Sequence, residues 1–445
     1  MTKVITYGTY DLLHHGHIRL LERAKALGDY LIVGVTAESF DQARGKINVQ
    51  QSLMERIEAV KRTGLADQII IEEYEGQKID DIRKYGIDIF TVGSDWEGKF
   101  DYLKEFCKVI YLDRTQGVSS TEIRSQNNEL RIGIIGETNL VNKFKNECKF
   151  VNGVKVIGLY ASNTSLLDSE SKSLTRGIDS VEILFKKCDA VYIASLPSLH
   201  YLHVKAALQN GLHVLCESPI SLHPYEFIEL CELAKAQGLI LMDGIKTAYS
   251  LAFNRMMLLI KGGIIGEVVS VDTVCTSLID FNNESIPINY IWNSIDWWGP
   301  TAMLPIFNIF GTEYKSIQLS SKALPTNPKF DIFTQCSFVY RNGVATFKVG
   351  QGVKSEGEMI ISGTKGYIYV PAPWWKTDYF EVRYENPSDN KRYFYQLDGE
   401  GIRYEILSFL QQTEGYYSAN QIPQGISMGI IKLIDHFLND HIKIS

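Results

Sequence analysis

Several patterns that mark particular classes of protein are missing from this sequence. The seven cysteines are scattered and show no CxxC spacing, which argues against a disulfide framework or a zinc site and favours reduced thiols in a cytoplasmic protein. Basic residues are not in excess, since 45 Lys and Arg face 52 Asp and Glu, and a net charge of −7 disfavours binding to nucleic acid or to an anionic membrane. No signal-type segment, membrane-length apolar run, low-complexity segment or short repeat is present. At 445 residues, of which 45% are apolar, the chain is expected to be a soluble protein of two or three domains.

The first 126 residues alternate between apolar strands and amphipathic helices, which is the pattern of a parallel sheet. The expected strands are 3–7, 30–35, 68–72, 87–92 and 109–112, and the expected helices are 17–27, 52–63 and 77–85. Ligands of such sheets bind beyond the carboxyl ends of the strands. Polar residues that follow these strands are therefore the first candidates for a site.

Residues 4–25, VITYGTYDLLHHGHIRLLERAK, join the first strand to the first helix through a polar turn. His14 and His17 are three residues apart, so both rings can share one face where the helix begins. The start of the helix supplies free N–H groups and a positive dipole, and Gly8 lets a phosphate approach the backbone. Incidental surface histidines are the structural alternative, but HxGH directly after a strand favours a phosphate site. The same turn also contains Thr9, Tyr10 and Asp11.

A second candidate anion site lies at residues 114–124, RTQGVSSTEIR. Ser119 and Glu122 have the spacing of a capping box, which by itself is structural. An arginine, a glycine and three successive hydroxyl residues ahead of a helix also suit phosphate oxygens. The residues predicted to bind phosphate here are Arg114, Ser119, Ser120 and Thr121.

Other polar residues lie between these two sites. Lys46 and Arg56, with Arg44, would each alone be an exposed cation, but beside two phosphate sites they are expected to clamp a triphosphate. Asp95 and Trp96 follow another strand, where an acid and an aromatic ring can hold a base or a ribose.

These motifs resemble those of glycerol-3-phosphate cytidylyltransferases, within the wider HxGH nucleotidylyltransferase group with its HUP-like, Rossmann-like fold. The segments that carry the resemblance are YGTYDLLHHGHIRLLERAKALGDYLIVGV, GSDWEGKFDYLKEFCKVIYL and RTQGVSSTEI. The resemblance implies that CTP, with Mg²⁺ on its phosphates, reacts with a polyol phosphate. His14, His17, Lys46 and Arg114 would then stabilise the transition state, and the other residues named above would bind the nucleotide. No metal ligand is assigned.

After a polar junction at residues 125–129 the pattern of strands restarts. Strands at 130–135, 155–160, 190–194, 211–217 and 239–242 predict a second doubly wound α/β domain with the rhythm of a dinucleotide fold. Beyond about residue 250, a helix at 252–261 and strands at 268–275, 332–340, 344–349, 358–362, 366–370 and 379–384 predict an α+β domain with a large open antiparallel sheet, closed by helices at 402–412 and 423–438. The expected domains are thus 1–126, 130–248 and 249–445.

This second part resembles the Gfo/Idh/MocA oxidoreductases. The carriers are GIIG at 133–136, LPSLHYLHVKAALQNGLHVLCESP at 196–219, GGIIGEV at 262–268 and GEGIRYE at 399–405. The resemblance implies that NAD or NADP is held by Gly136, Ser162, Leu196, Pro197, His200, Glu217 and Pro219. Lys246, Tyr249 and Thr301 are the candidates for the reductase substrate site, although His200 is favoured as a packing or loop-capping residue over an acid.

Four departures from that family pattern affect the predicted activity. Thr138 and Val141 replace the second and third glycines of the first turn, so a Cβ would crowd a pyrophosphate. The second strand ends in Ala-Ser-Asn at 161–163 without the acid that holds a ribose, which favours NADP or altered binding. Ser218 stands where the family has a lysine, and residues 298–305, WGPTAMLP, lack the family's aspartate and histidine.

Two hypotheses follow for the whole chain. In the first, a cytidylyltransferase makes a CDP-glycerol-like product and a reductase acts on its precursor or product, for a teichoic-acid-like or capsular polymer. In the second, the transferase is active and the second part is an inactive scaffold for assembly or regulation. Glycerol phosphate is the expected acceptor, with ethanolamine or another short polyol phosphate as alternatives. A homodimer or homotetramer is expected, because open sheets of this family usually pair.

Overall fold

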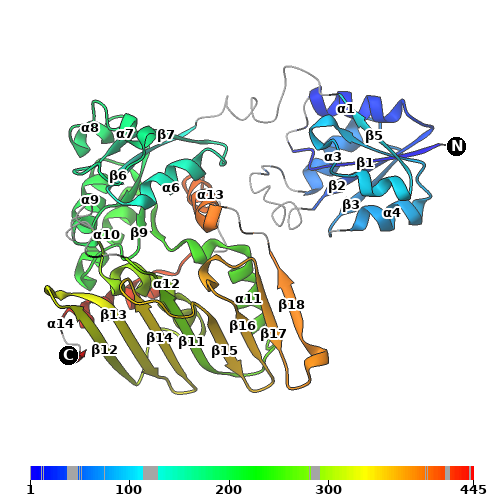
Figure 1. Cartoon of the computed structure of the whole chain (residues 1–445). Helices are drawn as coiled ribbons and strands as arrows, with labels where there is room; N and C mark the ends of the chain where they lie inside the picture. Colours follow the sequence, from blue (N-terminus) through cyan, green and yellow to red (C-terminus); the bar gives the residue numbers. More distant parts are fainter. Residues whose placement is uncertain are drawn as a thin grey trace. The chain divides into compact units, whose positions relative to one another are not determined.

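The structure is a computed structural model of the whole chain (Figure 1). It describes residues 2–11, 13, 15–37, 49, 51, 53–74, 76–113, 129–279, 281, 291–395, 397, 399–415, 421–439 and 442–444. Two compact units divide the chain, Met1–Asn128 and Glu129–Ser445. They are called unit 1 and unit 2 below, and each is described by itself.

Unit 1 is built on a five-stranded sheet in the order β3-β2-β1-β4-β5, in which every pair is parallel. Its strands are β1 (Lys3–Gly8), β2 (Tyr30–Thr36), β3 (Gln68–Glu72), β4 (Ile89–Gly93) and β5 (Lys108–Leu112). Its helices are α1 (His15–Lys25), α3 (Leu53–Arg62), α4 (Gln77–Tyr85), η1 (Ser94–Trp96) and η2 (Asp101–Glu105).

The helices of unit 1 cover both faces of its sheet (Figure 1). Leu21 of α1 and Val60 of α3 belong to one apolar core, and Ile82 of α4 and Leu103 of η2 belong to the other. The connections therefore change face between β1 and β4, the neighbouring strands at the centre of the sheet. Ligands of doubly wound sheets bind at such a switch point, and the predicted turns after Gly8 and Gly93 both lie there.

Unit 2 begins with a second parallel sheet, in the order β10-β9-β8-β6-β7. Its strands are β6 (Leu130–Gly136), β7 (Val154–Tyr160), β8 (Ala190–Ala194), β9 (His213–Glu217) and β10 (Leu241–Gly244). Its helices are α6 (Asn139–Cys148), α7 (Ser169–Leu174), α8 (Val181–Phe185), α9 (Pro197–Gln209) and α10 (Pro224–Gln237).

The rest of unit 2 contains a nine-stranded sheet in the order β18-β17-β16-β15-β11-β14-β13-β12-β19. The strands are β11 (Val268–Thr276), β12 (Ser316–Leu324), β13 (Asn327–Val339), β14 (Val344–Gly350), β15 (Met359–Gly363), β16 (Tyr367–Val370), β17 (Tyr379–Arg383), β18 (Lys391–Phe394) and β19 (Ile442–Ile444). The helical segments are η3 (Lys246–Tyr249), α11 (Leu251–Lys261), α12 (Ser294–Phe310), η5 (Trp374–Lys376), η6 (Pro387–Asp389), η7 (Gly399–Gly401), α13 (Ile402–Thr413) and α14 (Gln424–Asn439).

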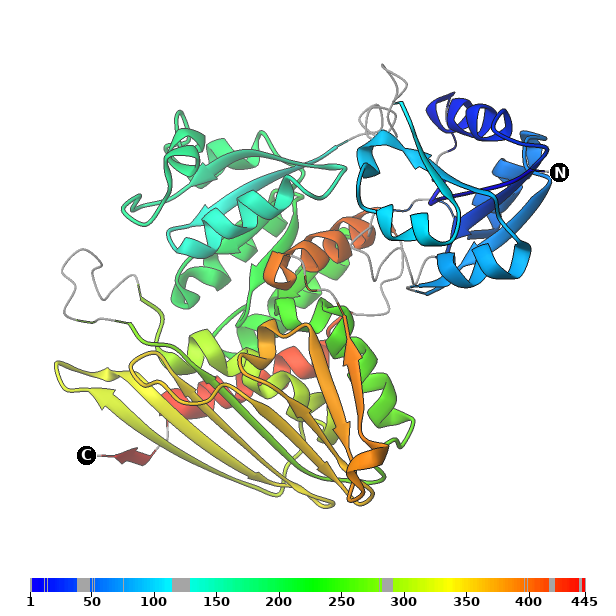
Figure 2. The ribbon, with the colours of Figure 1, turned by 45° about the vertical axis from the view of Figure 1, so that its right-hand side comes forward.

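The predicted fold class is confirmed, with one refinement of the large sheet. It is mixed and not wholly antiparallel, because β11 pairs in parallel with β14, and β12 with β19. Figures 1 and 2 show α11, α12 and α14 together on one face of this sheet. Among the helices of the described ranges, none has the length and apolar content that a membrane crossing requires.

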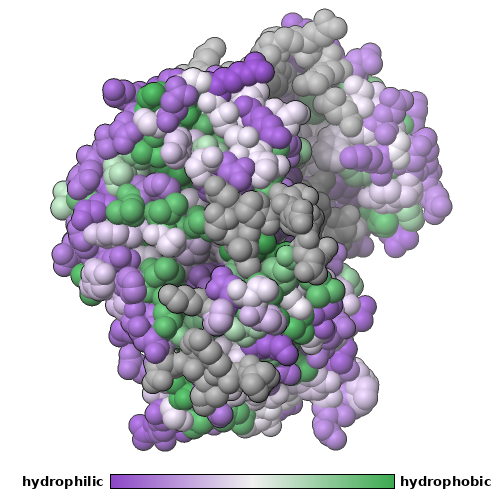
Figure 3. Space-filling model, turned by 60° about the vertical axis from the view of Figure 1, so that its left-hand side comes forward, coloured by the Kyte–Doolittle hydropathy of each residue, from purple (hydrophilic) through white to green (hydrophobic). Residues whose placement is uncertain are grey.

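Tryptophans gather where α12 meets the large sheet. The ring centroids of Trp297 and Trp298 are 6.3 Å apart, and those of Trp298 and Trp375 are 4.7 Å apart. Trp292 lies 5.5 Å from Trp297, and Trp374 lies 6.3 Å from Trp375. On the face that Figure 3 displays, hydrophobic residues form small patches between hydrophilic ones.

Candidate functional site

The turn after β1 places Tyr10 beneath His17. Tyr10 has the left-handed backbone angle φ 54° and is 2% exposed, and its ring meets the His17 ring edge-on with centroids 5.6 Å apart. A Cβ on Gly8 would come within 2.9 Å of the Tyr10 ring, so this glycine makes room for tyrosine as well as for any phosphate. In this structure Tyr10 orients the histidine, and its predicted contact with a nucleotide stays a prediction.

Arg56 holds the backbone of the same turn. Its side chain is fully buried, and Nη1 donates to the carbonyls of Thr9 and Thr36, each at 2.8 Å. Nε donates to the Gln51 carbonyl at 3.0 Å, while the Gln51 N–H donates to Asp11 at 2.9 Å. The sequence predicts that Arg56 clamps a triphosphate; here its guanidinium is buried against backbone carbonyls, and the contact with a triphosphate stays a prediction. Arg56 therefore holds the turn after β1 in place through hydrogen bonds to its backbone.

A buried polar network at the ends of β1, β2 and β3 was not predicted from the sequence. Lys78 of α4 forms an ion pair with Glu72, and the Thr36 hydroxyl donates to the other Glu72 oxygen at 2.8 Å. The Tyr7 hydroxyl donates to Asp81 at 2.9 Å, and burial and the Asp81 charge raise the pKa of Tyr7 far above its usual value. Such side chains have no local signature, because only the register of three strands brings them together.

Trp96 lies in η1 after β4, with its ring 5.8 Å from Phe100 and 5.0 Å from the Lys99 ammonium group. Asp95 is in the same short helix. The other predicted residues of unit 1 lie outside the described residues: His14, Lys46, Arg114, Ser119, Ser120 and Thr121. Among the described residues, no group of three or more His, Cys, Asp or Glu is arranged to hold a metal ion.

In unit 2, the first turn of the parallel sheet carries its own carboxylate. Glu137 is 6% exposed and accepts hydrogen bonds from the Ser162 N–H at 3.2 Å and the Ser162 hydroxyl at 2.9 Å. Ser162 follows β7, where the sequence has no acid of its own. A carboxylate is therefore present at the end of β7, supplied by the turn after β6, so the lack of an acid in residues 161–163 no longer favours NADP.

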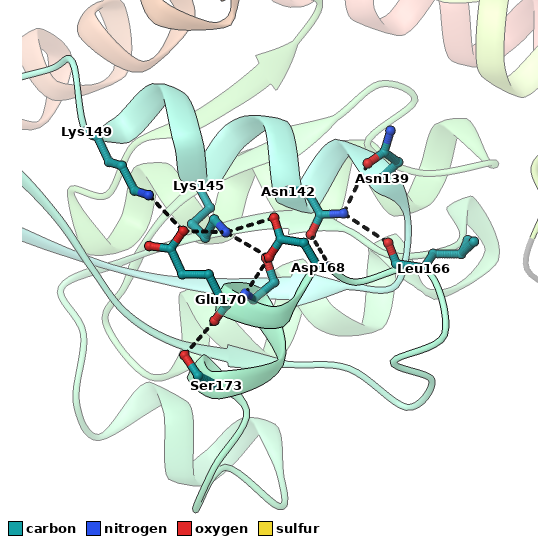
Figure 4. A network of polar contacts seen from close by, with 9 residues as sticks. Asn139, Asn142, Lys145, Lys149, Leu166, Asp168, Glu170 and Ser173 are labelled. Carbon is teal, nitrogen blue, oxygen red and sulfur yellow. Dashed lines mark hydrogen bonds and ion pairs between the residues drawn. The ribbon is translucent and has the colours of Figure 1, made fainter.

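A network of polar contacts fixes α6 against the segment after β7 (Figure 4). Lys145, 3% exposed in its side chain, pairs with Asp168 at 2.9 Å and with Glu170 at 3.1 Å. Asn142 donates to the Leu166 carbonyl at 2.9 Å and accepts from the Asp168 N–H at 3.1 Å. Asp168 also caps α7 through the Ser171 N–H. These contacts set the position of the helix whose first residues follow the glycine turn.

Three carboxyl groups lie at the ends of β9 and β10 and on α13, of which Asp243 and Glu405 are buried and Glu217 is half-buried. Burial raises the pKa of Glu217 to about 7, although the hydrogen bond from Tyr192 and the charge of Lys246 both lower it. Burial likewise raises the pKa of Asp243 to about 6 and that of Glu405 well above its usual value. The Tyr192 ring stacks on Phe144 of α6 with centroids 3.6 Å apart. This site can hold a proton near neutral pH.

The predicted reductase residues do not all meet at one point. Lys246, in η3 directly after β10, lies 3.2 Å from Glu400. The Tyr249 hydroxyl is buried and donates to the backbone carbonyl of Asp243 at 2.7 Å. Thr301 is half-buried on α12, a helix that packs on the large sheet. Lys246 is therefore the best placed of the three to reach a ligand at the strand ends.

His200 is enclosed at the start of α9. It is fully buried, and its ring nitrogens face the carbonyls of Pro219 at 2.7 Å and Ser195 at 2.8 Å. Burial lowers the pKa of His200 to about 4, and the two carbonyl contacts oppose this shift. Leu196 is the N-cap residue of the same helix, and Pro197 is its first residue. The histidine ties β8 to the Glu217–Pro219 segment.

The residues of this edge fit a dinucleotide in part. A Cβ on Gly136 would come within 2.5 Å of the Ala194 carbonyl, so only glycine allows β6 to leave the sheet here. Thr138 precedes α6, and its buried hydroxyl has no hydrogen-bond partner within the described chain. A buried oxygen of Glu405 is also without a partner there. Buried polar atoms are normally satisfied, so these two point to a ligand at the carboxyl edge of the sheet.

Comparisons with known proteins divide the chain in the same way. The cytidylyltransferase-like family model matches residues 5–126, and the oxidoreductase family model with an NAD-binding Rossmann fold, GFO_IDH_MocA, matches residues 130–245. A glycerol-3-phosphate cytidylyltransferase from Bacillus spizizenii is 52% identical over 124 residues, which is 28% of this chain and 95% of that protein. A second one, from Staphylococcus aureus, is 48% identical over 130 residues, with the same two shares.

Among solved structures, unit 2 is similar to a variant of a 3-ketoreductase from Actinomadura kijaniata, crystallised with TDP-benzene and NADP. The TM-score is 0.60 at 14% identity, and the match covers 72% of this chain and all of that one. At this identity the similarity shows the fold alone.

Proposed function

Because unit 1 belongs to the cytidylyltransferase-like family and residues 130–245 belong to the Gfo/Idh/MocA oxidoreductase family, we propose that the chain is a bifunctional enzyme. Unit 1 transfers CMP from CTP to glycerol phosphate or a similar polyol phosphate. Unit 2 is a NAD(P)-dependent reductase that acts on the precursor or the product. The high identity of the glycerol-3-phosphate cytidylyltransferases over almost their whole length is the observation that carries the first activity.

The transfer needs positioning and charge more than covalent chemistry. The acceptor phosphate oxygen attacks the α-phosphorus of CTP in line, a new P–O bond forms, and pyrophosphate leaves. We expect His17, at the start of α1 with the Tyr10 ring against it, to donate to the phosphates together with His14 and Arg114. Mg²⁺, carried on the CTP phosphates, would neutralise further charge.

A His17→Ala variant tests this assignment. We expect turnover of CTP with glycerol 3-phosphate to fall about 100- to 1,000-fold, the usual cost of removing one donor to a charged transition state. The measurement is pyrophosphate release, with CDP-glycerol identified by mass spectrometry. Arg19→Ala, a change at an exposed position of the same helix, is the control and should keep near-normal turnover. Near-normal turnover of a folded His17→Ala protein would rule the assignment out.

Reduction by unit 2 would place the dinucleotide along the carboxyl edge of its parallel sheet. Residues 136–138 would face the pyrophosphate, and Glu137 with Ser162 would face the adenosine ribose. NAD(P)H, when bound, supplies the hydride. The carbonyl oxygen of the substrate then needs a proton, for which Glu217, with its raised pKa and its hydrogen bond from Tyr192, is the candidate source.

The alternative is an inactive unit 2 that serves assembly or regulation. Thr138 in the glycine turn and Ser218 in place of the family lysine favour it. Titration of NADH and NADPH, followed by the fluorescence of the reduced nicotinamide, separates the two. Binding of either supports the reductase, whereas a folded protein that binds neither supports the scaffold. A cell-surface polymer is the proposed destination of the CDP-polyol, on the strength of the glycerol-3-phosphate cytidylyltransferase relatives alone.

A further inference from the structure

Three lysines of unit 2 converge on a single carboxylate. Lys376 of η5 lies 2.7 Å from Oε1 of Glu400, and Lys143 of α6 and Lys246 of η3 lie 2.9 Å and 3.2 Å from Oε2. The four side chains are between 20% and 38% exposed, so the cluster is reachable from solvent. Although burial raises it, the hydrogen bonds from Lys376 and Lys143 hold the pKa of Glu400 at about 2.

The cations outnumber the negative charge that faces them. Glu217 and Glu405 also interact with Lys246, but burial raises the pKa of both, so their charge is reduced near neutral pH. Glu147, next to the same loop, is paired with Arg403 at 3.1 Å. Three lysines and one ionised carboxylate leave a local excess of positive charge within the described residues. Burial and the charges of Lys376 and Lys143 accordingly lower the pKa of Lys246, against the pull of Glu400.

The backbone of Glu400 is held in an unusual conformation to reach the lysines. Its angles are φ 55° and ψ 21°, the left-handed region that non-glycine residues rarely adopt. Gly399 and Gly401 on either side also have positive φ, and a Cβ on Gly399 would come within 2.1 Å of Glu147. Strain of this kind persists where the surrounding structure imposes it, and it often occurs at ligand sites.

The cluster lies at the edge of the sheet where ligands of this fold bind. Lys246 follows β10 directly, and Lys143 is on the helix that follows the β6 turn. Figures 1 and 2 show α13, which η7 precedes, beside α6. The carboxyl ends of parallel strands meet at this edge. A ligand that occupies it would therefore reach both the lysines and the Tyr192–Glu217 pair.

We propose that Lys143, Lys246 and Lys376 form a binding site for a phosphate group of the reductase ligand, with Glu400 occupying the site until that ligand arrives. The inference rests on the proposed reductase function and adds the chemical class of its substrate: a phosphate ester or diphosphate, such as a polyol phosphate or a CDP-linked compound. A phosphate dianion has twice the charge of the carboxylate and more acceptor oxygens, so it suits three lysines better. The same chemistry is present in the phosphates of a dinucleotide, and the experiment distinguishes the two sources.

Lysine labelling of the full-length protein, read residue by residue by mass spectrometry, tests the site without interference from nucleotide binding in unit 1. The probes are glycerol 3-phosphate, CDP-glycerol and NADH, each compared with sodium chloride at equal ionic strength. We expect one of them to slow the acylation of Lys143 and Lys376 several-fold. Lys149 at the end of α6, paired with the exposed Glu170, is the internal control and should not change. Protection by the first two probes identifies a substrate phosphate, and protection by NADH alone identifies the cofactor. Unchanged labelling with all three would overturn the proposal.

Two variants test the site by binding affinity, which does not depend on the lysine labelling. Glu400→Gln removes the competing charge and should tighten binding of the protecting probe several-fold, while Lys376→Ala should weaken it. Equal affinity of wild-type and Glu400→Gln proteins, both folded, would also overturn the proposal. Nicotinamide fluorescence is measured in parallel. If NADH does not bind but glycerol 3-phosphate still protects the lysines, the reductase assignment fails and the phosphate site stands.

Discussion

Glu137 is the residue whose position matters most for the choice of cofactor. Its carboxylate comes from the turn after β6 and reaches the end of the neighbouring strand β7. A carboxylate there can accept hydrogen bonds from the ribose hydroxyls of NAD and repels the additional phosphate of NADP. We therefore predict a preference for NAD, whereas the structurally similar 3-ketoreductase was crystallised with NADP.

We expect the wild-type protein to bind NADH more tightly than NADPH, and Glu137→Gln to reduce that preference by about tenfold, which corresponds to about 1.4 kcal/mol of charge repulsion. Dissociation constants from nicotinamide fluorescence provide the measurement. Glu182→Gln, a change at an exposed position on α8, is the matched control and should leave the ratio unchanged. A wild-type protein that prefers NADPH would contradict the prediction.

Individual residues also show which features of the site can be predicted from the sequence and which cannot. The glycine turn, the strand ends and Lys246 follow from the order of residues, because backbone spacing alone decides which turn follows which strand. The direction of a side chain does not follow from spacing. Glu137 reaching Ser162, Arg56 reaching the Thr9 carbonyl and Glu400 reaching three lysines all depend on tertiary packing.

At the scale of elements, the strands of both parallel sheets are predicted from the sequence close to their observed positions, whereas α6, α10, β12 and α12 are not. Helix α12 contains Pro300 and Pro305, and it is apolar around most of its circumference because it is buried against the large sheet. Prolines usually end a helix, and a helix buried on all sides has no amphipathic period to detect. The sequence therefore predicts no helix over this segment.

Two glycines on α14 provide a matched pair for the packing of this layer. Gly425 has nothing within 4 Å of an added Cβ, whereas a Cβ on Gly429 would come within 2.4 Å of the Thr312 side chain after α12. Gly425→Ala should raise the free energy of unfolding by up to about 1 kcal/mol, because alanine favours the helix. Gly429→Ala should lower it by about 1–3 kcal/mol through overpacking. Urea denaturation checks both, and equal effects would refute the close approach of α14 to Thr312.

At the scale of the whole molecule, the two compact units predict two unfolding transitions in calorimetry. CTP should raise the temperature of one transition and the preferred nicotinamide nucleotide that of the other, since each ligand stabilises only the unit that binds it. A single transition shifted by both ligands would contradict this independence.

Residues 1–128 expressed alone should retain cytidylyl transfer, because unit 1 covers almost the whole length of the glycerol-3-phosphate cytidylyltransferases that it matches.

The buried carboxyl groups of unit 2 predict a pH dependence of its stability. Glu217, Asp243 and Glu405 have raised pKa values in the folded state, so each of these groups binds more protons in the folded protein than in the unfolded chain above about pH 4.5. Their contribution to stability falls as pH rises through this window, whereas that of His200, whose pKa is lowered to about 4, rises up to about pH 6.5. Glu217 alone, with a pKa of about 7 in place of 4.5, corresponds to roughly 3 kcal/mol at most.

Denaturation of unit 2 at pH 5 and pH 8 measures this effect. The Glu217→Gln variant should be less sensitive to pH over the same interval, because its amide does not ionise. Glu400 acts in a separate window, since its pKa of about 2 means that its stabilising contribution is lost only as pH falls below its unfolded value of 4.5. Equal pH sensitivity of the wild-type and Glu217→Gln proteins between pH 5 and pH 8 would contradict the raised pKa of Glu217.

The gathering of tryptophans at α12 and the large sheet has an optical consequence. Of the six tryptophans in the chain, five are in unit 2 and Trp96 is the sole one in unit 1. Tryptophan emission is therefore dominated by one unit, and Trp96→Phe would make it a signal from that unit alone. In the reverse direction, quenching of Trp96 by CTP would appear as a small change on a large constant background. Reduced nicotinamide absorbs where tryptophan emits, so energy transfer from the five tryptophans would report dinucleotide binding in the intact chain without any attached dye.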